Sequence, residues 1–127
     1  MIPIEEYRTW FRLRVTDPEP KQIAATALDA YERTVTVSVG AVAADNLASV
    51  MVAATNRSRA VWDLGVDLLL RLAVQFVDAQ EAVRNLMCSR KFDHRLRVIA
   101  SLRPGPSFEL LTELILLGLD DPRFRVR

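Results

Sequence analysis

The sequence has few of the residues that usually carry catalysis or bind metals. Among its 127 residues there is one cysteine, Cys88, and one histidine, His94. A structural zinc site usually needs four Cys or His ligands, and nucleophilic catalysis usually needs a base beside the nucleophile. Phosphate-loop, dinucleotide-binding, HExxH and GxSxG motifs are also missing. We therefore expect no enzymatic activity, no cofactor and no metal site, with Cys88 packed and His94 solvated.

Signals for secretion or for a membrane span are equally weak. A single cysteine cannot form an intramolecular disulfide, so nothing points to an oxidising compartment. Residues 1–10 contain two acids where a signal peptide has a basic region, and no apolar core follows. The longest weakly charged stretch has Asp45 near its middle, which costs about 2.5–3.5 kcal/mol in a bilayer. We therefore expect a cytoplasmic protein with no membrane partner.

Glycine is scarce, and the net charge is close to zero. Four glycines are too few for an all-β domain rich in tight turns. A formal net charge of +1 gives no general electrostatic reason for binding nucleic acid. Because half of the residues are apolar and 26% are charged, the composition is typical of a folded domain, and we expect a single one over 1–127.

The sequence does contain apolar residues at helical spacing. This spacing predicts helices over 21–39, 45–55, 58–76, 78–88, 92–102 and 107–118. The helix over 58–76 is apolar on most sides, and its polar stripe consists only of Asp63, Asp67, Arg71 and Gln75. We therefore expect it in a middle layer, with an Asp67–Arg71 ion pair and with Gly65 allowing close packing. Asp45, Asp78 and Ser107 are the expected N-caps, and Gly118 is the expected helix stop.

Three segments alternate with a period of two and resemble strands: 11–16, 34–42 and 123–127. Together they could form a small sheet against the helices, which would give an α+β domain. The stretch "TVTVSV" from Thr34 follows a helical run with no turn residue before it, so we favour helix there. The prediction is an all-α fold, with the α+β fold as the alternative.

Three stretches of the chain resemble one another: "NRSRAVWDLGVDLL" from Asn56, "KFDHRLRVIASL" from Lys91 and "DDPRFRVR" from Asp120. Each has a polar start followed closely by Arg and an apolar residue. This pattern resembles the opening of HEAT-like repeats over roughly 56–127, which implies a short α-solenoid of antiparallel helix pairs. The expected pairs lie in 18–55, 56–90 and 91–119, after an N-terminal segment 1–17; an irregular helical bundle is the alternative.

On this interpretation the residues 120–127 begin another repeat or form a cap. A solenoid end that lacks a polar cap exposes an apolar surface. We therefore expect a non-enzymatic protein-interaction module, with self-association into a homo-oligomer as one form of it. The expected partner-binding residues are Arg123, Phe124, Arg125 and Val126.

Positive charge is concentrated in the C-terminal third, which suggests the alternative function. A nucleic-acid-binding repeat would use a basic face formed by Arg84, Arg90, Lys91, Arg95 and Arg97. The competing interpretation is that these arginines pair with nearby acids such as Asp93, Asp120 and Asp121. The aromatic cluster Tyr7, Trp10 and Phe11 is also open to two interpretations, because an aromatic N-terminal helix could cap the stack or bind a ligand.

Overall fold

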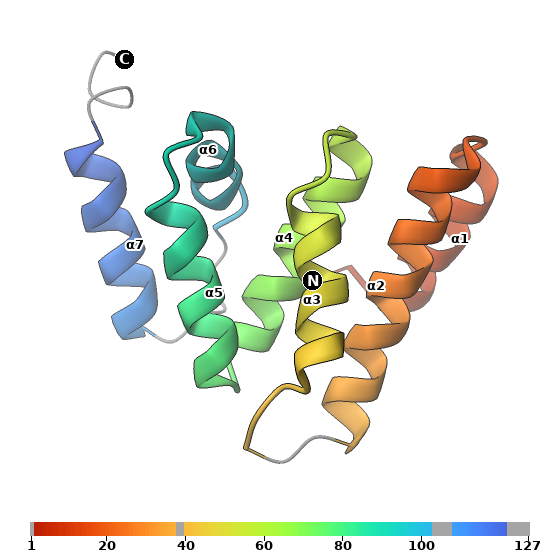
Figure 1. Cartoon of the computed structure of the whole chain (residues 1–127), viewed down its shortest axis with the longest axis horizontal. Coiled ribbons are helices and arrows are strands. Elements are labelled where there is room, and N and C mark those ends of the chain that lie inside the picture. Colours follow the sequence, from red (N-terminus) through yellow and green to blue (C-terminus); the bar gives the residue numbers. More distant parts are fainter. Residues whose placement is uncertain (1, 38–39, 103–107, 122–127) are drawn as a thin grey trace.

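The structure, a computed structural model, describes residues 2–37, 40–102 and 108–121. These residues form helices that lie in a row, with α1 and α7 at opposite ends (Figure 1). The helices are α1 (Ile4–Arg14), α2 (Pro18–Val37), α3 (Ala44–Ala54), α4 (Arg59–Ala73), α5 (Val77–Met87), α6 (Phe92–Ala100) and α7 (Phe108–Asp120). Each of the six helices predicted from apolar spacing is therefore present, with ends shifted by a few residues.

The all-α prediction is confirmed, and the α+β alternative is wrong for the residues that can be checked. Residues 11–14 belong to α1 and residues 34–37 to α2, and the described residues contain no strand. The threonines fit the helix because their hydroxyls donate to carbonyls one turn earlier, Thr34 to Ala30 at 2.8 Å and Thr36 to Glu32 at 2.7 Å. Residues 38–39 and 123–127 lie outside the described residues.

Helix α4 occupies the middle of the fold, as its apolar surface predicts. It packs against α2, α3, α5 and α6, and a side-chain hydrogen bond between Tyr7 and Asp67 connects it to α1. Its core side chains are fully buried, among them Val61, Leu64, Leu68, Leu69 and Leu72. Removing such leucines typically costs about 2–5 kcal/mol each, so the stability of the domain depends strongly on this helix.

Two glycines allow helices to approach closely. A Cβ atom added at Gly65 would lie 2.2 Å from the backbone nitrogen of Ala54, so α4 contacts the backbone of α3 directly. A Cβ at Gly118 would lie 2.8 Å from Cδ1 of Ile99, a side-chain atom that can move. Gly118 was expected to end its helix, but α7 continues to Asp120, and the glycine instead makes room for α6.

The predicted caps Asp45 and Asp78 are also wrong. Both lie in the first helical turn, and the cap positions are taken by Ala43 and Phe76, without side-chain cap bonds. The Asp78 carboxylate instead accepts a hydrogen bond from the backbone N–H of Val42 at 2.8 Å. It therefore fixes the segment before α3 against the start of α5. Ser107 lies outside the described residues.

No helix among the described residues is long and apolar enough to cross a membrane.

Replacing Gly65 with alanine should destabilise the fold, because backbone atoms of α3 cannot move aside as a side chain could. We expect a loss of about 3 kcal/mol in the free energy of unfolding, measured by urea titration followed by circular dichroism. Gly118→Ala is the matched control, and its smaller loss reflects the mobile Ile99 side chain it meets. Equal stability of the two variants would contradict the proposed backbone contact.

Candidate functional site

The outward face of α7 is the largest group of exposed apolar side chains on one described helix. Ile115, Leu116 and Leu119 are 45%, 57% and 64% exposed, while Leu110 and Leu114 on the opposite face are buried. Positions 115 and 119 are one helical turn apart, and 116 is adjacent, so the three side chains form one continuous surface. We call these three residues the α7 face. Exposed apolar patches of this kind often mark interaction sites.

The predicted partner-binding residues Arg123, Phe124, Arg125 and Val126 lie outside the described residues. The described chain ends at Asp121, whose side chain is 4% exposed and forms an ion pair with Arg95. Arg95 also donates to the backbone oxygen of Ser89 at 2.8 Å. These bonds connect the end of α7 to α6 and to the turn that precedes α6. Arg95 thus pairs with a nearby acid, as one interpretation of the sequence predicted.

The five basic residues of the alternative site have different environments. Arg84 donates to Glu113 at 2.7 Å and to Glu81 at 2.6 Å, and the bond to Glu113 is the main cause of its raised pKa. Arg95 pairs with Asp121. The side chains of Arg90 and Lys91 are exposed. Arg97 is buried. Three of the five basic residues, Arg84, Arg95 and Arg97, therefore make contacts within the protein.

Arg97 is on α6, is 9% exposed, and contacts α3 and α4. It donates to the backbone oxygen of Ala54 at 3.1 Å, and its guanidinium lies over the Trp62 ring, 5.0 Å from the centroid. Burial lowers the pKa of this guanidinium. The carbonyl at the C-terminal end of α3 and the aromatic face both favour a cation, which explains how the charge is accommodated in the interior.

Cys88 and His94 are placed opposite to expectation. Cys88 is exposed, and His94 is half-buried, with Nδ1 3.4 Å from the hydroxyl of Ser89. Burial lowers the pKa of His94, and the neighbouring charges of Arg97 and Lys91 lower it further. Within 2–37, 40–102 and 108–121, no three His, Cys, Asp or Glu side chains gather as metal ligands would.

At the other end of the row, α1 and the residues before it contact Asp67 and Arg71 in the middle of the polar stripe of α4. The predicted Asp67–Arg71 ion pair is present at 3.0 Å, and the Tyr7 hydroxyl donates to the same Asp67 oxygen. Arg71 also donates to the backbone oxygen of Ile2 at 2.6 Å, and its guanidinium lies 5.6 Å from the centre of the Tyr7 ring. Burial and the bond to Asp67 both raise the pKa of Tyr7.

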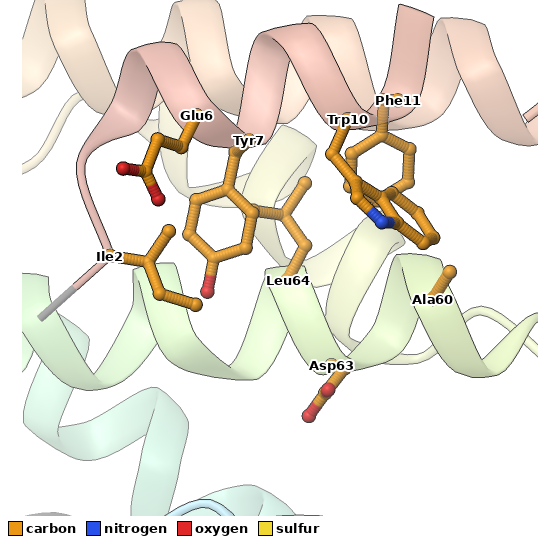
Figure 2. A pocket seen from close by; sticks show the side chains of 8 residues that line it. All are labelled: Ile2, Glu6, Tyr7, Trp10, Phe11, Ala60, Asp63 and Leu64. Carbon is orange, nitrogen blue, oxygen red and sulfur yellow. The ribbon is translucent and has the colours of Figure 1, made fainter. Parts of the chain in front are cut away.

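A cavity of about 260 Å³ lies beside this hydrogen-bonded group, between α1 and α4. Figure 2 shows the side chains around it, with three aromatic rings from α1 facing α4. Its lining residues are Ile2, Glu6, Tyr7, Trp10, Phe11, Ala60, Asp63 and Leu64. The sequence suggested that Tyr7, Trp10 and Phe11 either cap the stack or bind a ligand. In the structure they cover α4 and also line a cavity.

Comparisons of the chain with models of protein families, with curated proteins and with solved structures find no match.

Replacing Tyr7 with phenylalanine should cost about 1.5 kcal/mol at pH 8, because a bond to a charged acceptor is lost. The pKa of Tyr7 is higher in the folded state than in the unfolded chain. Over a range of high pH the native protein therefore retains the hydroxyl proton of Tyr7 while the unfolded chain releases it. The stability that Tyr7 contributes is therefore complete below about pH 10, its unfolded pKa, and decreases at higher pH. Urea titrations of both proteins at several pH values measure this difference. A difference independent of pH would contradict the assignment.

Proposed function

We propose that this chain is a protein-interaction module that self-associates through the α7 face. The observation that carries the proposal is the exposure of Ile115, Leu116 and Leu119 on one helix at one end of the row. Covering such side chains is favourable, by about 25 cal/mol for each Å² of apolar surface removed from water. A partner that covers this face would continue the helical row in the way that stacked HEAT-like repeats do.

A second copy of this chain is the partner that the proposal names. In a two-fold dimer each surface meets its own copy, so Ile115, Leu116 and Leu119 of one copy would cover the same three side chains of the other. The residues predicted from the sequence as partner-binding, Phe124 and Val126, follow α7 in the chain and lie outside the described residues.

Nucleic-acid binding through Arg84, Arg90, Lys91, Arg95 and Arg97 has less support. Arg84 and Arg95 already pair with acids, and Arg97 is buried against Trp62. A basic face would rest mainly on Arg90 and Lys91, and affinity from phosphate contacts grows with the number of cations involved. We therefore retain this function only as an alternative.

The test is light scattering on a size-exclusion column, with nuclease-treated protein over a range of protein concentrations and at two salt concentrations. We expect a dimer, and we expect Leu116→Glu to weaken it at least tenfold, because a charge replaces an apolar contact in both copies. Leu13→Glu is the matched control: Leu13 is 67% exposed on α1, at the opposite end of the row, and its replacement should leave the dimer intact. A wild-type monomer at every concentration would overturn the proposal of self-association.

A further inference from the structure

The α1–α4 cavity combines aromatic surface with uncompensated negative charge. Tyr7, Trp10 and Phe11 supply the aromatic part, while Glu6 and Asp63 are the only ionisable groups besides the Tyr7 phenol among the described residues that line it. The Trp10 ring packs edge-on against Phe11, with 5.1 Å between centroids, and Trp10 remains 46% exposed. One side of Trp10 therefore stays available to a ligand.

Glu6 and Asp63 differ from Asp67, the third acid nearby, in their bonding partners. Asp67 is satisfied by Tyr7 and Arg71. In contrast, no cation or hydrogen-bond donor from the described parts of the chain reaches the Glu6 or Asp63 carboxylate. Glu6 is on α1 and Asp63 is on α4, and the cavity lies between them. Both carboxylates are exposed, so they add negative charge at the edge of the cavity.

Aromatic faces and carboxylates together favour organic cations. A ring face attracts a cation at up to about 6 Å from the centroid, and a carboxylate adds longer-range attraction. The fold already uses this chemistry internally, since Arg97 lies over Trp62 and Arg71 over Tyr7. A cavity of about 260 Å³ is near the lower end of the volumes of ligand pockets, about 300–1,000 Å³, which suits a small molecule.

We propose that the α1–α4 cavity binds a small organic ammonium compound, with the cation against Trp10 and with the exposed carboxylates of Glu6 and Asp63 adding longer-range attraction from the edge of the cavity (Figure 2). Phe11 and Leu64, which are 4% and 1% exposed, form a rigid apolar wall for its hydrocarbon part. Inorganic cations fit less well, because the described carboxylates do not gather as metal ligands would. This proposal concerns the end of the row opposite the α7 face, and it does not depend on self-association.

The probes are choline and its neutral carbon isostere 3,3-dimethylbutan-1-ol, added to the full chain at equal ionic strength. Binding is followed through the indole N–H signals of Trp10 and Trp62 in two-dimensional nitrogen–proton NMR spectra, assigned with Trp10→Phe and Trp62→Phe. We expect choline to shift the Trp10 signal in a saturable way and to bind at least about tenfold more tightly than the alcohol.

Two variants locate the cation, and one serves as the control. Asp63→Asn should weaken choline binding severalfold and leave the alcohol unaffected. Trp10→Leu, in which binding is followed through the backbone amide signals of the lining residues Ala60 and Leu64, should remove the preference for choline. Glu109→Gln removes an exposed acid on α7, far from the cavity, and should change neither affinity. Equal affinity for the two probes, or unchanged choline binding by both Asp63→Asn and Trp10→Leu, would overturn the proposal.

Discussion

The close contact between α3 and α4 at Gly65 is the constraint on which the other helices depend. Because no side chain separates Gly65 from the backbone of Ala54, α4 lies deep enough to contact helices on both sides. The carbonyl of the same Ala54 accepts the bond from Arg97, so α6 is anchored at the point where α3 and α4 meet. A cation placed at the C-terminal end of α3 also interacts favourably with the dipole of that helix.

Local features of the sequence predicted the fold well where short-range interactions decide it. Apolar spacing identified the helices, and the Asp67–Arg71 pair followed from a separation of one turn. The strand-like pattern at Thr34 supported only the α+β alternative, because alternation of Thr and Val does not reveal that each hydroxyl can bond to its own helix. The cap at Asp78 was wrong because Val42, distant in sequence, provides the donor for that carboxylate.

The candidate sites were less predictable, because partners from distant segments decide them. The polar stripe of α4 could be identified, but nothing in it indicated that Tyr7 of α1 would cover it. The basic residues from Arg84 to Arg97 are clustered in sequence, yet Glu113, Asp121 and Trp62 engage three of them separately. The all-round apolar character of "LLTELILLGL" from Leu110 did contain a signal for the α7 face, since α7 lies at one end of the row of described helices and part of this apolar surface is exposed there (Figure 1).

The way α1 is held has a consequence for the order in which the chain folds during its synthesis. Arg8 of α1 pairs with Asp29 and Glu32 of α2, which is translated directly after it. Tyr7, in contrast, is bonded to Asp67 and the Ile2 carbonyl to Arg71, both on α4. At about 5–20 residues per second, α1 leaves the ribosome several seconds before α4 is complete. A helix of 11 residues is marginal by itself, so until then α1 has only its contacts with α2 to stabilise it, and its bonds to α4 form last.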